Sequence, residues 1–312
     1  MTKRNYDLFE ELDNSKKSIT TSDLDNGVLT PEKQEEYIRV LHGKSVVLKD
    51  THFIDMGAQQ VDIDRTGFGQ RVMRGIKADG TSEESKPYFK TNKLIAKPVG
   101  FDFALQDHAA RRSIEKDNLG ETLIAMAGAT SAVDLEDLFF NGNTESQDPL
   151  LVETDGWFKK ATHQETVEVD YETVEDIEKV FEKALEVLPK EYFDNPEEYA
   201  FYVPYDVHKA YRDLLKERAT QTGDDATTKA KLPDYEGIPV KHVNVLNRPE
   251  SGDKVLLCNP RNMVHGIFYE TTIEDQRNAK KRQTDYVVTA EADCHFENQE
   301  AAVTVTITEP SA

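Results

Sequence analysis

The chain has 312 residues, enough for one large domain or two of ordinary size with a substantial core. Hydrophobic residues make up 38% and charged residues 31%, and no apolar run is long enough to span a bilayer. The formal net charge of -21 argues against nonspecific binding to nucleic acid, which depends on Lys and Arg contacts with phosphate.

The N-terminal region is polar and lacks the apolar core of a secretory signal, so we expect synthesis and folding in a cytoplasm. Residues 1–30 are irregular, with Ser, Thr, Asp, Asn and Lys dominant between 13 and 26, which is typical of a mobile arm. A helix is predicted over 30–43, because Thr30 can cap it and Pro31 suits its first turn.

Residues 57–107 read as a β-ribbon. Alternating segments flank a tip at 77–86, where Asp79-Gly80 is a turn signal. The ribbon has too few apolar residues for a core of its own, and an isolated two-stranded ribbon is barely stable in water. We therefore expect it to lean on another element, and a neighbouring chain is a natural candidate.

The longest helical pattern covers 113–140. At 1.5 Å per residue this helix would be roughly 35–40 Å long, and Asn141-Gly142 should stop it, with Gly just past the last turn. Its apolar stripe contains Leu119, Leu123, Met126, Val133 and Phe140, with Ile124, Leu135 and Leu138 beside it.

Three acids, Asp134, Glu136 and Asp137, lie near the end of this helix. Adjacent helix positions point in different directions, so the cluster is a weak catalytic candidate. We interpret the acids as a solvated or subunit-facing side. Negative charge is slightly unfavourable near a helix C-terminus, so we expect a basic partner from an adjacent subunit. The apolar neighbours, including Phe139 and Phe140, should anchor the helix end on a sheet.

A compact α/β unit is predicted over 172–258, because helices and strands alternate there. Thr173 can cap one helix and Pro189 ends it, and Pro204 and Tyr205 open another. Around them lie a strand-like patch at 156–169 and strands at 199–203, 238–246 and 254–258.

The C-terminal part is predicted to be all strand, over 264–275, 284–297 and 301–309. It cannot be a domain alone. We expect it to pair with strands near 95–105 and to pack on the long helix. The α/β unit would then be an insertion between two segments of another domain.

The chain contains no motif that calls for an enzyme. Gly67, Gly69 and Gly75 have the wrong spacing for a dinucleotide fingerprint. The segment 62–67 resembles the start of a calcium loop, but Met73 occupies the position that requires Glu. Cys258 and Cys294 lie far apart in strand-like runs and are interpreted as buried free thiols.

The order of these parts, over roughly 30–309, resembles the major capsid protein of tailed bacteriophages, which has the Hong Kong 97-like fold. Matching features are the polar arm, the extended ribbon (the E-loop of that family), the return strand "NKLIAKPVGFDFALQD" and a spine helix ending "LFFNGN". The α/β unit resembles the axial domain, and the run from "NPRNMVHGIFYE" onward resembles the return to the peripheral sheet.

The resemblance implies an α+β fold with four parts. These are an N-terminal arm at 1–50, an E-loop at 57–93, a peripheral domain at 94–171 and 263–312, and an axial domain at 172–262. It implies a structural protein, not an enzyme and without cofactors, that self-assembles in the host cytoplasm into the icosahedral head shell of a virion enclosing DNA.

The implied partners are the protein itself, as pentamers and hexamers, a separate scaffolding protein, a portal and decoration proteins. Packaged DNA would be touched only nonspecifically, and no membrane is involved. An encapsulin-like nanocompartment shell is the alternative with the same fold. A hydrolase or transferase with Asp206 or His208 in its site is the alternative from another class.

Charged and turn residues on the ribbon, the helix end and the segment "RNAKKR" (277–282) are our candidates for contacts between subunits. For that segment a solvated loop is the preferred reading over a local patch that binds nucleic acid. Some members of the family crosslink a Lys of the E-loop to an Asn of a neighbour, but no residue here aligns to that chemistry and we predict none. The contact candidates are Lys77, Asp79, Gly80, Lys86, Glu136, Asp137, Arg277, Lys280, Lys281 and Arg282.

Overall fold

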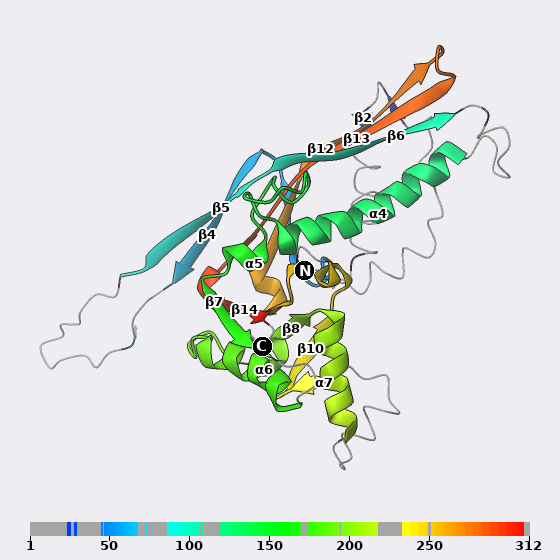
Figure 1. The fold of residues 1–312 in the computed structure, drawn as a ribbon. Coiled ribbons are helices and arrows are strands. Elements are labelled where there is room, and N and C mark those ends of the chain that lie inside the picture. The colour runs from blue at the N-terminus through cyan, green and yellow to red at the C-terminus, as the bar shows by residue number, and fades with distance from the viewer. Residues whose placement is uncertain are drawn as a thin grey trace, which may run out of the picture. The chain divides into compact units, whose positions relative to one another are not determined.

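The fold of the chain is drawn in Figure 1 from a computed structural model. The predicted helix over 30–43 and the ribbon tip, apart from Lys86, lie outside the described residues. The residues that the structure describes are 24–25, 28–29, 45, 47–67, 73, 86–106, 108, 119–169, 174–193, 195–217, 233–248 and 251–308.

The chain divides into two compact units. The first comprises 1–44, 100–132 and 270–290, and the second comprises 45–99, 133–269 and 291–312. Four elements contribute residues to both units: helix α4 (Leu119–Asn141) and strands β6 (Lys97–Gln106), β12 (Met263–Asn278) and β13 (Gln283–Phe296).

The C-terminal strands β12 and β13 pair with each other, and β13 also pairs with β6. This confirms the predicted pairing of the C-terminal part with strands near 95–105. The sheet has the order β1-β2-β12-β13-β6, and β3 pairs with β12 in parallel. Its remaining strands are β1 (Leu24–Asp25), β2 (Val28–Leu29) and β3 (His52–Met56).

A second six-stranded sheet has the order β7-β14-β11-β8-β10-β9 and belongs to the α/β unit. Its strands are β7 (His163–Glu168), β8 (Ala200–Val203), β9 (Asp234–Tyr235), β10 (Ile238–His242), β11 (Lys254–Cys258) and β14 (Ala302–Thr308). The other short elements are α5 (Trp157–Lys160), η3 (Pro196–Glu198), η4 (Asn244–Asn247), η6 (Pro260–Asn262) and η7 (Gln299–Ala301).

Helices α6 (Val174–Val187) and α7 (Tyr205–Glu217) confirm the two helices predicted within this unit. Their apolar stripes enter its core, where Phe181 lies 4.8 Å from Phe201 and 5.1 Å from Tyr211, measured between ring centroids. Val180 is also buried, although the spacing did not predict it. The described positions that the three- and four-residue spacing predicted to face inward are buried: Ile177, Phe181, Ala184, Leu188, Val207, Tyr211, Leu214 and Leu215.

The placement of the last strand, predicted over 301–309, was wrong. β14 forms as predicted, but it runs parallel to β7 and antiparallel to β11, inside the α/β sheet. Its Val and Ile residues alternate with Thr, and Thr304 is only 3% exposed and donates through Oγ1 to the Phe158 carbonyl. A period of two identifies a strand but not the partner beside it.

The strand-like patch predicted at 156–169 is a strand only in its second half, β7. The first half is helix α5, in which consecutive side chains Trp157 and Phe158 are both buried, at 0% and 4% exposure. A strand sends neighbouring side chains to opposite faces, so one turn of helix brings both rings into the same core more readily.

Candidate functional site

The C-terminal end of α4 is closely packed within the second unit. Phe139 and Phe140 are fully buried, and their ring centroids lie 5.8 Å and 5.1 Å from that of Trp157. Phe139 also faces His265 of β12 at 5.8 Å, and its carbonyl accepts from the Cys294 thiol of β13 at 3.5 Å. The prediction that apolar residues anchor the helix end on the sheet is confirmed.

Gly142 follows the last residue of α4, so the predicted helix stop is confirmed, but its physical reason is close contact. Its nitrogen donates to Leu138 O at 2.9 Å, and its carbonyl accepts from Gly156 N at 2.8 Å. A Cβ atom at Gly142 would lie 2.4 Å from Thr154 O. Among the described glycines, only Gly237 and Gly252 have the positive φ expected of a left-handed cap.

Glu136 and Asp137, predicted to lie on a solvated or subunit-facing side, are 4% and 3% exposed within the chain. That expectation of solvation was wrong. It came from treating charged residues near a helix end as surface residues, whereas partners from distant segments cover this end of α4. The basic partner expected from an adjacent subunit is Arg248 of the same chain.

Glu136 ties α4 to the segment that precedes β3. Its Oε1 atom accepts from Ser45 Oγ at 2.9 Å and from the Val47 nitrogen at 3.0 Å. Burial raises the pKa of the Glu136 carboxyl, and the two hydrogen bonds offset only part of that rise. The carboxyl is therefore an acid whose ionised form is disfavoured in the fold.

This shift has a testable consequence for stability against pH. The folded state holds the Glu136 proton where the unfolded chain has lost it, so stability falls as pH rises above 4.5, the ordinary value for Glu. Glu136→Gln keeps the accepting oxygen and removes the titration. We expect the stability of E136Q relative to wild type to increase between about pH 4 and about pH 7.

Urea unfolding of both proteins at the two pH values measures this difference. A constant or shrinking advantage of E136Q towards neutral pH would contradict the assignment of a buried, easily protonated carboxyl.

Asp137 forms the second polar contact of the helix end. Arg248 bonds Asp137 Oδ2 through Nη1 and donates to Asp134 Oδ1 through Nη2 at 3.2 Å. Asn141 donates to Asp137 Oδ1 at 2.6 Å. Burial raises the pKa of Asp137, while Asn141 and Arg248 pull it downward. Arg248 is 40% exposed and bridges one exposed and one buried carboxylate.

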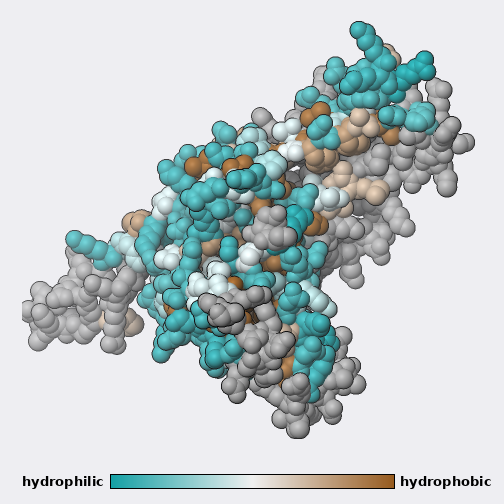
Figure 2. All heavy atoms as spheres, in the orientation of Figure 1, coloured by the Kyte–Doolittle hydropathy of each residue, from teal (hydrophilic) through white to brown (hydrophobic). Residues whose placement is uncertain are grey.

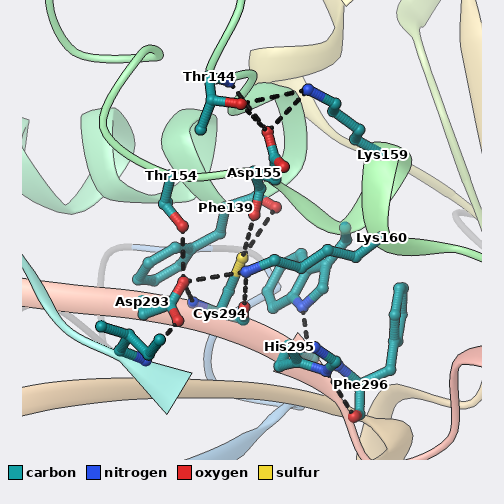
Figure 3. A network of polar contacts seen from close by, with 12 residues as sticks. Phe139, Thr144, Thr154, Asp155, Lys159, Lys160, Asp293, Cys294, His295 and Phe296 are labelled. Carbon is teal, nitrogen blue, oxygen red and sulfur yellow. Dashed lines mark hydrogen bonds and ion pairs between the residues drawn. The ribbon is translucent and has the colours of Figure 1, made fainter. Parts of the chain in front are cut away.

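A third buried acid, Asp293 of β13, joins three separate segments of the same unit (Figure 3). Its Oδ1 atom accepts from Thr154 at 2.7 Å, from Lys160 at 3.0 Å and from its neighbour's nitrogen, Cys294 N, at 2.8 Å. Its Oδ2 atom accepts from Ile95 N at 2.8 Å. These four donors satisfy the buried Asp293 carboxylate, and the bond from Ile95 fixes the end of strand β5.

The ribbon itself is a two-stranded antiparallel hairpin of β4 (Gln60–Gly67) and β5 (Tyr88–Ile95), as predicted. Its inner face packs on its own chain, where Leu94 is fully buried beside Met56 and Val264. Asn92 donates to the carbonyl of Phe296 at 2.8 Å. The base of the hairpin is therefore supported without a neighbouring subunit.

Glu300 of η7 anchors the hairpin through Lys90 of β5. It accepts from Lys90 Nζ at 2.7 Å and from Tyr192 Oη at 2.9 Å. The Arg65 guanidinium lies 5.5 Å from the Tyr192 ring centroid. The hydrogen bonds from Lys90 and Tyr192 lower the pKa of Glu300. These contacts connect both strands of the hairpin to the α/β unit.

Glu300→Gln should loosen this connection without unfolding the chain. An exposed ion pair contributes up to about 1 kcal/mol, so we expect backbone amide exchange in β4 and β5 to accelerate about threefold, with α6 unchanged. Hydrogen exchange with mass spectrometry measures both. The matched control is Glu186→Gln, which removes the exposed Lys183 pair of α6, and equal acceleration of the hairpin in this control would contradict the role of Glu300.

The contact residues predicted from the sequence fall into three groups. Lys77, Asp79 and Gly80 lie outside the described residues, and Lys86 is exposed just before β5. Glu136 and Asp137 are buried, as described above. The basic residues at the junction of β12 and β13 are all exposed: Arg277, Lys280, Lys281 and Arg282.

The remaining chemical groups form no recognisable catalytic arrangement in the described part of the chain. Asp206 is exposed in the first turn of α7, and His208 has a buried Nε2 atom without a hydrogen-bond partner. The His208 ring lies 6.1 Å from that of His242, and burial lowers the pKa of both. Among the described residues, neither histidine has a hydrogen bond or ion pair to an acid.

Cys258 and Cys294 are buried free thiols, as predicted, and burial raises the pKa of each to about 12. Such thiols are inert at neutral pH. The described residues contain no cluster of three or more His, Cys, Asp or Glu that could hold a metal ion. No helix among them has the length and apolarity needed to cross a membrane.

Sequence reasoning missed Arg248, Asp293 and Glu300. Arg248 and Glu300 lie in short polar connections, and Asp293 lies in an alternating strand, where an acid normally indicates the solvent face. Their partners are more than 100 residues away along the chain. The local signal nearest to Asp293 was the lone Trp157 of the chain, whose indole donates to the carbonyl of His295, two residues further along β13.

No protein-family model matches the chain. A curated relative, named "Putative prophage capsid protein YqbE" in Bacillus subtilis (strain 168), is 28% identical over 303 residues, covering 93% of this chain and 96% of the relative. The chain is thus similar to a prophage capsid protein along nearly its whole length.

Solved structures with the same fold include chains of phage capsids and of a GTA particle. A chain of the satellite phage P4 procapsid including size determination (Sid) protein has a TM-score of 0.67 at 15% identity, with 98% of each chain covered. The mature capsid of bacteriophage PhiM1 gives 0.59 at 10% identity, covering 95% and 93%. An empty GTA particle gives 0.58 at 11% identity, covering 98% and 100%. The mixed helix and sheet fold of this chain is that of phage capsid structures.

Proposed function

We propose that this chain is the major capsid protein of a tailed bacteriophage or prophage, a structural protein that assembles with copies of itself into the icosahedral shell around phage DNA. The observation that carries the proposal is the end-to-end similarity to a prophage capsid protein. The agreement in fold with chains of several phage particles supports it. The prophage and phage relatives do not favour the encapsulin-like alternative.

Within this proposal the fold is of the Hong Kong 97-like type. The polar region 1–50 is the arm, 57–93 is the E-loop, and α4 is the spine helix. The axial domain is 172–262 together with β7 and β14, because these two strands belong to its sheet. The remainder of 94–171 and 263–312 is the peripheral domain.

The hairpin β4–β5 supports an E-loop role, because its two faces have different environments. The inner face packs on its own chain, while the outer face exposes Phe89 at 72% and Ile95 at 44%. Asp62 and Asp64 are exposed on that same face. In the proposed shell, a neighbouring subunit covers these side chains.

The other proposed partners follow from the same role. The copies associate as pentamers and hexamers, assembly takes place in the host cytoplasm, and a separate scaffolding protein, a portal and decoration proteins join the particle. The acidic chain contacts packaged DNA only nonspecifically. No enzymatic step, cofactor or membrane enters this function.

Deleting 77–86 tests the E-loop assignment. We expect the deletion to reduce the yield of particles at least about tenfold while leaving thermal unfolding nearly unchanged, because many weak contacts add up in a closed shell. Sedimentation and a melting curve measure the two properties. Loss of the folded monomer, or undiminished particle yield, would contradict the assignment.

A further inference from the structure

The end of the β12–β13 hairpin is a concentrated positive charge on a strongly acidic chain. Four basic residues lie within 277–282, although acidic residues outnumber basic ones 59 to 38 over the whole chain. All four are exposed, and hydrophilic side chains cover this end of the hairpin in Figure 2.

Within the described part of the chain, no ion pair involves Lys280, Lys281 or Arg282. Arg277 interacts with other groups of the chain, which leaves Lys280, Lys281 and Arg282 as the positive charges of the turn. The nearest described acids along the hairpin are Glu274 and Asp285.

The turn presents these charges in a defined conformation. Asn278 Oδ1 accepts from the Lys281 nitrogen at 3.2 Å, and Arg282 has a φ of 55°, the left-handed region that few residues other than Gly adopt. Strand β13 is supported close to the turn by Tyr286, whose ring stacks on that of Phe103 with 4.9 Å between the ring centroids. Because Arg282 keeps a strained backbone conformation on a well-packed turn, we infer that its side chain has a function at this position.

We propose that this basic turn, residues 278–282, binds a carboxylate-rich surface of a second copy of the same chain. The inference rests on the proposed shell function and specifies the chemistry of one subunit contact. Copies with a net charge of -21 repel one another, and at physiological salt charges are screened beyond about 8 Å. Local patches of opposite sign are therefore needed where copies meet, and this turn supplies the positive patch.

DNA is the less suitable occupant. Nonspecific binding to DNA gains its affinity from the number of phosphate contacts, because each contact releases counterions, so a surface that makes few contacts binds DNA weakly. Three unpaired cations on one turn of a strongly acidic chain are too few to hold a duplex. The same three suffice to orient one contact between proteins, because electrostatic complementarity fixes register and suppresses wrong partners.

The test uses full-length chains in two isotopic forms, unlabelled and nitrogen-15 labelled, mixed before assembly. A carbodiimide joins amines to carboxylates with no spacer, so it links only groups already in contact. We expect mass spectrometry of the particles to find Lys280 or Lys281 of one isotope joined to an Asp or Glu of the other. Particles without such mixed links at either lysine would overturn the proposal.

A charge reversal provides the second arm. Lys280→Glu with Lys281→Glu should raise the protein concentration needed for assembly at least about tenfold. Raising NaCl from about 0.05 M to about 0.5 M should reduce the difference in this concentration between the variant and wild type. The control with the same change in net charge is Lys190→Glu with Lys209→Glu, on exposed residues of the α/β unit. Equal assembly of K280E/K281E and wild type overturns the proposal.

The remaining outcomes are also informative. If K280E/K281E assembles normally but its particles lose nucleic acid, the turn binds DNA and the proposal is wrong. If the wild-type chain forms no particles under any condition, the shell function itself fails, and this inference fails with it. If the wild type forms particles, but neither the cross-links nor the charge reversal shows a role for the turn, this inference alone is wrong.

Discussion

Gly142→Ala should destabilise the second unit by about 3 kcal/mol, at the upper end of overpacking effects. The added Cβ would lie 2.4 Å from Thr154 O and 2.5 Å from Leu138 O. Both are backbone atoms, which cannot swing aside as a flexible side chain can. Gly156 meets the same segment from the other side, with its own Cβ position 2.6 Å from Phe140 O. Because neither glycine has a side chain, the backbone at the end of α4 can cross the segment before α5 in direct contact.

Chemical denaturation of G142A and wild type measures this effect. The matched control is Gly57→Ala, because a Cβ there would meet nothing within 4 Å and Gly57 has no positive φ. We expect G57A to change stability by less than about 0.5 kcal/mol. If G142A and G57A were equally stable, the backbones near Gly142 and Thr154 could separate without loss of stability, and their close contact would be wrong.

Arg248→Ala should cost about 3 kcal/mol at neutral pH, because it leaves the buried Asp137 carboxylate without its cation. The loss should be smaller in acid, since Asp137 already has a raised pKa and becomes neutral as the pH falls. Arg248→Lys keeps the charge but not the two-pronged bridge to Asp134 and Asp137, so its cost should be intermediate.

A double-mutant cycle separates the ion pair from packing. In the Asp137→Asn background, R248A should cost much less than in wild type, because no buried charge remains. Arg261→Ala, which removes an exposed arginine with no ion pair among the described residues, serves as the control. Equal costs of R248A in both backgrounds would mean that Arg248 acts only by covering apolar surface.

Local patterns predicted most elements of this chain. The three- and four-residue spacing of Ile177, Phe181 and Ala184 was enough to predict α6 and its buried face, because helical amphipathicity is a property of one segment. The alternation in 57–107 likewise predicted the hairpin β4–β5. In both cases the necessary information lies within a few residues of each position.

The surroundings of the helix end could not be predicted in this way. Asp137 meets Arg248 across 111 positions of the chain, and Glu136 meets Ser45 across 91. No local pattern marks these acids as buried, since their type and their place near a helix end both suggest solvent. The same limit applies to β14, whose alternation is compatible with either sheet until the neighbouring strands are known.

Gly142 shows how a correct prediction can rest on the wrong cause. Its position after Asn141 predicted a helix stop by left-handed capping, and the stop is present. The residue is required because the backbone near Thr154 and Gly156 leaves no room for a side chain. Such a contact involves a segment that approaches only after folding.

Electron microscopy of the purified chain, produced with and without a co-expressed scaffolding protein, tests the shell function most directly. We expect closed icosahedral particles whose subunits form pentamers and hexamers, either alone or with a scaffolding partner. A chain that stays monomeric at high protein concentration in both preparations would contradict the shell function.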